Sequence, residues 1–376
     1  MFTRNILGLL GGSLFFCLAP QAFAEETTTA SSKMQWNAYL DFYYQHSPQG
    51  HVSPSMNPGP NVVEGRFFDR YSDQMTLSMA EVSFKKSTEK LQLKMDLAFG
   101  EMVDELSGGS SAASLEATRH LTQATLTYQA HERLKFTLGK FYSYMGMEVV
   151  KAKDNWQYSR SYSFNYGIPF WHEGVSASYV MIPEQLTGSL YVLNGWDGRV
   201  SHNVSSKVTL GASLSYAGVK DLIVNYNYIG GSESTDNGYR SVNEVNALYA
   251  VTPRFSLALD YTAGSQTEIT EGDARWQGLT LYLKMAFTDF YTLSPRYELF
   301  DDSDKGFAIA GGLSGTGTRQ KITSWTLSNN FTLDQGLEAR LELRSDKSDS
   351  DLYFKDKDGE PTDHQESVAL ALLYGF

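Results

Sequence analysis

The segment 144–170 combines charged and aromatic side chains in a way that could control the passage of charged solutes. Side chains of both signs that face one another in a narrow passage select ions by their electric field, without covalent chemistry. A segment of this length between ordered elements is usually functional or disordered. We expect it to fold inward and form a constriction, and a solvated external loop is the alternative. The charged candidates for this constriction are Glu148, Lys151, Lys153, Asp154 and Arg160.

The remaining reactive side chains do not form a catalytic or metal-binding motif. The seven histidines are scattered, and none lies in a Gly-x-Ser-x-Gly or His-Glu-x-x-His sequence. His172, Glu173 and Ser176 are close in sequence but match no such spacing. The acidic segments 301–306 and 346–360 lack the ligand spacing of an EF-hand loop, so we expect solvated carboxylates that divalent ions could bridge to lipopolysaccharide. The sequence therefore predicts neither an enzyme nor a cofactor.

The two ends of the chain indicate an exported protein. Residues 1–24 contain Arg4, an apolar run over 6–18 and an Ala-Phe-Ala sequence before Glu25, which is the layout of a cleaved signal peptide. We expect a short N-terminal segment at 25–33 and one domain at 34–376. The net charge of −12 becomes −13 when Arg4 is removed, and this excess of acid argues against nucleic acid as a partner. Because Cys17 is the single cysteine, the exported chain cannot form an internal disulfide.

Alternation of apolar and polar residues predicts sixteen strands. Most have the length that a tilted strand needs to cross a bilayer. They are expected at 34–45, 73–85, 89–99, 118–129, 133–143, 171–181, 185–196, 205–216, 219–229, 241–251, 254–263, 275–287, 289–300, 319–331, 336–345 and 366–376.

The connections between these strands alternate between tight turns and longer loops, with 264–274 among the longer ones. Hairpins with long loops on one rim and tight turns on the other are typical of outer-membrane barrels. The sequence therefore predicts an all-β fold, a transmembrane antiparallel up-and-down β-barrel of about sixteen strands. Its turns would be periplasmic and its long loops extracellular. The last strand, which ends in "VALALLYGF", would pair with 34–45 and leave no free edge.

The apolar face of each predicted strand would meet lipid, and the charged face would line a lumen that holds water. A soluble β-sandwich would place the same charges outside. The phase slips between Met79 and Ala80, which suggests a bulge. Pro295 indicates a bulge or a strand that begins near Arg296. Lys140 would need a bulge at Gly139 to reach the lumen. The lumen-facing candidates are Lys94, Asp96, Arg133, Lys135, Arg296, Glu298, Glu338, Arg340, Glu342 and Arg344.

Several stretches resemble the β-barrel porin-2 (OmpL-like) family of Gram-negative outer membranes. The clearest is "LGKFYSYMGMEVVKAKDNWQYSRSYSFNYGIPFWHEGVSASY" at 138–179, and 190–198, 227–233, 295–302 and 339–349 follow in the same order. The resemblance implies an outer-membrane channel for small hydrophilic solutes and gives no catalytic residues. It also implies that Phe376 and Tyr374 form the signal read by the outer-membrane assembly machinery. Sixteen-stranded porins are commonly trimers, so a homotrimer is one expectation.

We therefore expect an outer-membrane porin that gives passive diffusion through a lumen narrowed by 144–170. A substrate-selective channel is one alternative, and a structural or adhesive barrel with a closed lumen is another. Because the predicted lumen mixes lysine and arginine with acidic residues, we expect modest ion selectivity at most.

Overall fold

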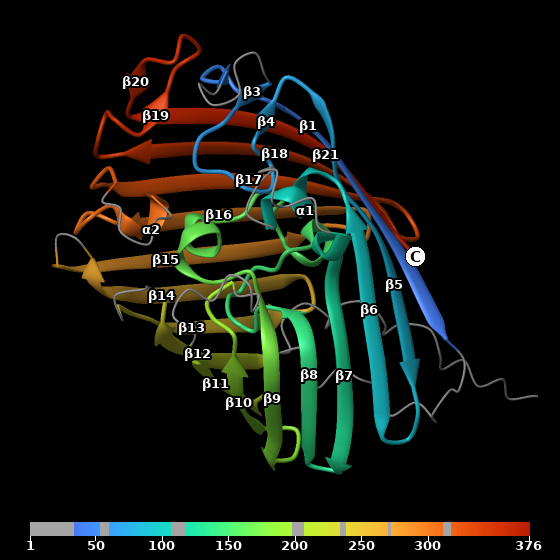
Figure 1. Cartoon of the computed structure of the whole chain (residues 1–376). Coiled ribbons are helices and arrows are strands. Elements are labelled where there is room, and N and C mark those ends of the chain that lie inside the picture. The colour runs from blue at the N-terminus through green and yellow to red at the C-terminus, as the bar shows by residue number, and fades with distance from the viewer. Residues whose placement is uncertain are drawn as a thin grey trace, which may run out of the picture.

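Sixteen antiparallel strands close into a barrel in the computed structural model, which describes residues 34–52, 60–106, 117–197, 207–233, 238–269, 272–310 and 317–376 (Figure 1). The predicted signal peptide and the segment 25–33 lie outside the described residues. The barrel strands are β1 (Gln35–His46), β5 (Met75–Ser87), β6 (Leu91–Phe99), β7 (Leu121–His131), β8 (Leu134–Tyr142), β9 (Trp171–Ile182), β10 (Leu186–Leu193), β11 (Thr209–Val219), β12 (Leu222–Ser232), β13 (Tyr239–Thr252), β14 (Phe255–Ile269), β15 (Gly272–Ala286), β16 (Tyr291–Asp301), β17 (Lys321–Asp334), β18 (Leu337–Ser348) and β21 (His364–Gly375).

The first and last strands close the barrel, as the sequence predicted. The β1–β21 register runs from Tyr39 opposite Gly375 to His46 opposite Val368. Beyond the strand, the backbone of Phe376 exchanges two hydrogen bonds with Ala38, at 3.0 and 3.1 Å. The Phe376 ring meets the Trp36 ring edge to face, with centroids 5.6 Å apart. Closure leaves no strand edge open for pairing with another chain.

Connections of unequal length lie on opposite rims of the barrel. Tight turns at 88–90, 132–133, 183–185, 220–221, 253–254, 287–290 and 335–336 form one rim. Longer connections on the other rim hold the small strands β2 (His51–Val52), β3 (Asn61–Val62), β4 (Tyr71–Ser72), β19 (Phe354–Lys355) and β20 (Pro361–Thr362), and the helices α1 (Glu101–Leu106), η3 (Ala117–His120) and α2 (Phe307–Ala310). The predicted long loop at 264–274 is wrong, because β14 and β15 stay paired up to Ile269 and Gly272.

Side chains alternate between an apolar outer face and a lumen face along each strand. In β21, Val368, Leu370 and Leu372 are exposed, whereas Ala369 and Ala371 are at most 3% exposed. Exposed aliphatic side chains in a regular band are the reverse of a soluble sandwich and fit a lipid environment. Among the described residues, none of the helices has the length and apolar character needed to cross a membrane.

The three irregular places in the sequence have different outcomes. The predicted bulge occurs one residue earlier, where Ser78 is left unpaired as the register passes from Met79 to Leu77. Pro295 stays inside β16 and pairs with β17, while pairing with β15 is interrupted beside it because proline has no N–H to donate. The β8–β9 register is continuous, so Lys140 keeps the outward phase of Leu138 and its ammonium lies 4.3 Å from the centre of the Trp171 ring.

Candidate functional site

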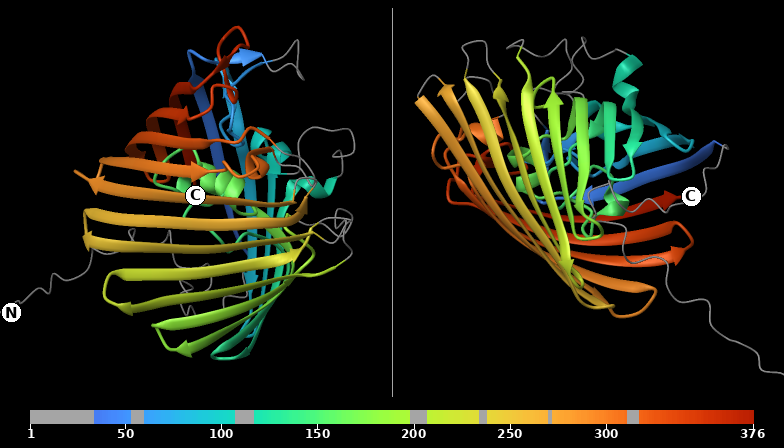
Figure 2. Two further views of the ribbon diagram at one scale, coloured as in Figure 1. Left: turned by 90° about the vertical axis from the view of Figure 1, so that its left-hand side faces the viewer. Right: turned by 90° about the horizontal axis from the view of Figure 1, so that it is seen from below.

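The connection between β8 and β9 lies inside the ring of strands rather than above it (Figures 1 and 2). We call residues 144–170 the inner loop. It contains one turn of 3-10 helix, η4 (Ala152–Asp154), and a short π-helix, η5 (Ser163–Gly167). The expected inward fold of the segment is thus observed. The inner loop divides the lumen, and its contacts decide how much of the lumen remains for solutes.

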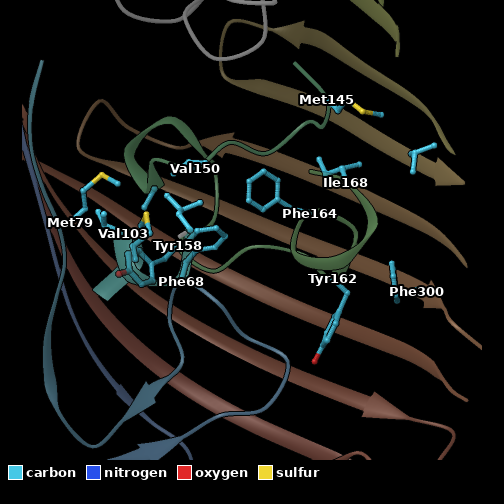
Figure 3. Packing of buried hydrophobic residues seen from close by; sticks show 14 of the residues in the cluster. Phe68, Met79, Val103, Met145, Val150, Tyr158, Tyr162, Phe164, Ile168 and Phe300 are labelled. Atoms are coloured by element: carbon cyan, nitrogen blue, oxygen red, sulfur yellow. The ribbon is translucent and has the colours of Figure 1, made fainter. Parts of the chain in front are cut away.

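Apolar side chains hold the inner loop on the side of the long-loop rim. Tyr158, Phe164 and Ile168 are buried in one cluster with Phe68 of the first long connection and Val103 of α1 (Figure 3). The rings of Phe68 and Phe164 lie 5.7 Å apart. Burial of several large apolar side chains is worth about 1.5–3 kcal/mol for each of them. Three separate connections therefore form a small hydrophobic core inside a polar lumen.

Carboxylates of the barrel wall accept hydrogen bonds from the backbone of the inner loop. Glu342 of β18 accepts from the N–H groups of Tyr158 and Ser159, at 2.6 and 2.9 Å. Glu298 of β16 accepts from Tyr162 and Ser163 in the same way, at 2.8 and 2.7 Å. Buried backbone donors must be paired, and a carboxylate is a strong acceptor for them. Glu342 thus fixes the loop where it has no regular secondary structure, and Glu298 fixes the start of η5.

Arginines of the same wall donate to the carbonyl groups of the inner loop. Arg340 donates to Ala152 at 2.9 Å and to Gln157 at 3.0 Å. Arg344 donates to the carbonyl of Arg160 at 2.6 Å. Arg296 donates to the carbonyl of Ser159 at 2.7 Å and to the Glu148 carboxylate at 2.5 Å. The planar guanidinium group suits several acceptors at once, so the wall satisfies both donors and acceptors of the loop.

The two parts of the inner loop contact different walls. At its start, the Tyr144 hydroxyl donates to the carbonyl of Tyr228 in β12 at 2.7 Å, and the Tyr144 ring stacks on Tyr191 of β10. Residues 147–163 make their hydrogen bonds to the wall with residues of β1, β5 and β14–β18. The opposite wall, β7–β12, presents small hydroxyl and amide side chains to the lumen. Thr125, Thr127, Thr137 and Ser213 are partly exposed, whereas Ser176, Ser178, Ser189 and Asn225 are only 7–8% exposed.

The five predicted constriction residues divide into two groups. Glu148 and Arg160 are 3% and 1% exposed. Glu148 accepts from the backbone and hydroxyl of Ser161, and Arg160 donates to the carbonyls of Val150 and Tyr158. They hold the loop together. The side chains of Lys153 and Asp154 are 41% and 40% exposed, and they form an ion pair at 3.3 Å.

Lys151 belongs to neither of these two groups. Its ammonium contacts Glu81 of β5 and lies 3.7 Å from Asp96 of β6. Burial lowers the pKa of Lys151, but the two carboxylates outweigh burial, and the pKa lies above its ordinary value. Lys151 is therefore charged and ties the loop to the wall. The prediction missed two carboxylates, Glu81 and Asp41, although both occupy the lumen phase of their strands. Asp41 accepts a hydrogen bond from the Tyr158 hydroxyl.

The other predicted lumen residues follow the alternation, with one correction. Asp96, Arg296, Glu298, Arg340, Glu342 and Arg344 are buried under the inner loop, whereas Lys94, Lys135 and Glu338 are partly exposed. Arg133 lies in the turn before β8 rather than on the strand. The prediction extended that strand by one residue, because the turn has no glycine or proline to mark its end.

A carboxylate supports the far end of the inner loop. Asp197, in the connection after β10, accepts hydrogen bonds from the N–H groups of Phe170 and Trp171, at 2.7 and 3.4 Å. Burial raises the pKa of Asp197 to about 7 against these hydrogen bonds and the field of Arg240. The end of the loop thus rests on a group that titrates near neutral pH.

Within the described residues, the candidate groups for catalysis and metal binding are not assembled. His172 contacts the Ser143 hydroxyl at 3.2 Å but is fully buried. No cluster of three His, Cys, Asp or Glu side chains in this part of the chain could hold a metal ion. In the acidic segment 301–306, Asp302 instead accepts from the backbone N–H groups of Ala308 and Ile309 in α2.

A closed barrel with an apolar band outside and charged side chains inside defines a transmembrane β-barrel channel. The chain matches the family described as "Putative beta-barrel porin-2, OmpL-like" over residues 33–376 and belongs to it. It is an outer-membrane porin, and the tight-turn rim is the periplasmic one. Comparison with curated proteins finds no match.

Solved structures of outer-membrane proteins share this fold at low sequence identity. The anion-selective porin from Comamonas acidovorans is 11% identical, with a TM-score of 0.61, over 92% of this chain and 100% of that one. OmpT of Vibrio cholerae is 12% identical, with a TM-score of 0.57, over 94% and 99% of the two chains. The channel DcaP of Acinetobacter baumannii is 12% identical, with a TM-score of 0.56, over 91% and 97%. At these identities the likeness concerns the fold alone.

Proposed function

We propose that small hydrophilic solutes diffuse passively between the inner loop and the wall formed by β7–β12. The anchorage of residues 147–163 on β1, β5 and β14–β18 carries this proposal. Glu298 and Glu342 draw the loop toward β14–β18, and on the opposite wall Thr125, Thr127 and Thr137 keep partly exposed hydroxyl groups that water can solvate. A loop held by buried charged hydrogen bonds is a fixed constriction rather than a mobile lid. Lys153 and Asp154, as its most exposed charges, face the diffusing solute.

The same proposal covers export and assembly. Residues 1–24 direct export, and Phe376 with Tyr374 serves the assembly machinery, since the terminal residue is exposed and completes the closing strand. The apolar band contacts lipid, and the acidic outer loops contact lipopolysaccharide through divalent ions. The barrel assembles as a homotrimer and carries out no catalysis.

A structural or adhesive barrel with a closed lumen is the second candidate. The hydrophobic cluster on the side of the long-loop rim favours it, because Phe68, Val103 and Phe164 fill part of the lumen with side chains from three connections. Under this alternative the polar wall of β7–β12 would be solvated without giving a continuous path. The porin should conduct ions, and the closed barrel should not.

Planar-bilayer recording of the refolded protein distinguishes the two candidates. We expect stepwise conductance, and no conductance in several salts would support the closed barrel. The single cysteine, Cys17, lies in the expected signal peptide, so the expected mature chain has no cysteine. A Lys153→Cys variant can therefore be modified selectively with a bulky thiol reagent. This modification should reduce conductance. The same modification of Lys86→Cys, an exposed position on the outer face of β5, should not, and equal effects would contradict the proposed constriction.

A further inference from the structure

The lumen face of β7–β12 carries neutral polar side chains that lie next to one another across the strands. The strand registers arrange these side chains in two rows. The first row consists of Thr127, Thr137, Ser176 and Tyr191. The second row consists of Ser178, Ser189, Ser213 and Asn227. Lys135, beside the turn before β8, is the one lysine, arginine or acidic residue in the lumen phase of these six strands.

The hydroxyl groups of this wall bond to one another and keep further hydrogen-bonding capacity. The hydroxyls of Thr127 and Thr137 lie 3.0 Å apart, and Ser189 donates to Ser178 at 2.8 Å. A hydroxyl offers one donor and two acceptor sites, so a pair that shares one hydrogen bond still has a donor and three acceptor sites. Because Thr127 and Thr137 are partly exposed, a solute in the lumen can use these sites.

The ionised side chains that share the lumen with this wall have partners. Lys153 and Asp154, the most exposed charges of the inner loop, form an ion pair at 3.3 Å. The ammonium of Lys94 lies 3.4 Å from the carboxylate of Asp96. Three further lumen lysines near the periplasmic rim each have an interaction partner as well: Lys85, Lys135 and Lys284. Within the described residues, the proposed path thus runs between a nearly uncharged wall and charges that already have partners.

We infer that the channel favours neutral polyhydroxylated solutes, such as monosaccharides and short polyols, over charged solutes of equal size and either sign. The inference rests on the proposed diffusion path past the inner loop and names the solutes that suit this path. A sugar that enters the lumen exchanges hydrogen bonds to water for hydrogen bonds to the wall hydroxyls, so the exchange is of like for like. A charged solute loses part of its hydration in a narrow passage, and the wall of β7–β12 supplies no opposite charge in return.

The test is the uptake of three labelled sugars of nearly equal size into liposomes that contain the refolded full-length channel. Glucose is neutral, glucuronate is anionic and glucosamine is cationic. In the unchanged protein, glucose should enter about tenfold faster than either charged sugar, a difference of about 1.4 kcal/mol.

Two changes at one wall position test the physical reason. Thr137→Asp places a negative charge on the lumen face of β8 and should raise the uptake of glucosamine about tenfold without raising that of glucuronate. Thr137→Asn is the matched control, because it has nearly the same shape and no charge, and it should keep the order of the three rates. Ser213→Asp, on β11, should act in the same direction as Thr137→Asp and guards against a folding defect specific to β8.

The outcomes separate this inference from the proposed function. Equal uptake of the three sugars, or faster uptake of a charged one, would overturn the preference for neutral solutes and leave the diffusion path in place. Equal effects of Thr137→Asp and Thr137→Asn would also overturn the inference, since the missing charge of the wall would not be what slows charged sugars. Absence of uptake for all three sugars would overturn the proposed function and the inference together.

Discussion

Replacement of Glu342 by glutamine should loosen the inner loop at Tyr158 and Ser159. The two oxygen atoms of Glu342 each accept one backbone hydrogen bond from the loop, at 2.6 and 2.9 Å. Glutamine keeps one acceptor, turns the other into a donor that faces an N–H group, and removes the charge. A hydrogen bond to a charged group contributes about 1.5–3 kcal/mol, and a buried unpaired donor costs about 1–3 kcal/mol.

The expected loss of local stability is therefore about 2–4 kcal/mol, which corresponds to a factor of about 30 to 1000 in the opening equilibrium. Hydrogen exchange followed by mass spectrometry measures this directly as faster exchange of the amides in 156–161. The hydrogen bonds of Glu298 to Tyr162 and Ser163 remain, so the loop should open locally and the barrel should stay folded.

Glu338→Gln is the matched control for this experiment. Glu338 lies on the same strand, two residues before Arg340, accepts from that arginine, and is partly exposed. Its amide can still accept this hydrogen bond, so exchange in 156–161 should change little. If the Glu342→Gln variant exchanged no faster than the control, the carboxylates of the wall would not be what holds the inner loop.

Three further predictions follow from the contacts of the loop and the closing strand. Burial raises the pKa of Asp197 from 3.8 to about 7. Its stabilising contribution is therefore complete below about pH 4 and is lost as pH rises through 7. Hydrogen exchange near Phe170 should become faster over this pH range in the unchanged protein, and Asp197→Asn should remove this pH dependence. Deletion of Phe376, which removes two hydrogen bonds and the Trp36 contact, should lower the folded yield on unheated gels more than the conductance of folded channels. Arg160→Glu should prevent folding, whereas Lys153→Glu should fold and shift permeability toward cations.

Each of these predictions has a result that contradicts it. Identical exchange profiles for Asp197→Asn and the unchanged protein would show that the carboxylate does not bear on the loop end. A normal folded yield without Phe376 would remove the terminal residue from assembly. A folded, conducting Arg160→Glu barrel would mean that its bonds to the carbonyls of Val150 and Tyr158 are dispensable.

The strand number and the closure could be predicted from the sequence because both depend on local patterns. Alternation along each strand and the regular change between tight turns and long loops do not depend on distant contacts. The pattern failed at 264–274 for a physical reason. There β14 and β15 extend past the apolar band, and outward positions such as Arg275 and Gln277 are exposed polar residues. Without an apolar face, alternation no longer marks a strand.

The roles of the loop charges could not be predicted, because they depend on partners far away in sequence. Glu148 and Lys153 are both charged residues of one segment, and nothing local distinguishes them. Glu148 is buried because it pairs with Arg296 of β16, the wall on which the loop lies. The partners of Arg160 are backbone carbonyls, which leave no signal in residue types. Which loop charge faces water is therefore decided by the wall opposite it.

The net charge of the chain and the sign of the lumen have separate origins. The sequence carries −12, which by itself would suggest a preference for cations. A fixed inner loop needs acceptors for its backbone N–H groups. Glu298 and Glu342 supply these acceptors and are buried as a result. Acidic residues are thus withdrawn from the aqueous path by the same contacts that place the constriction. The net charge of the sequence therefore does not give the charge of the aqueous path.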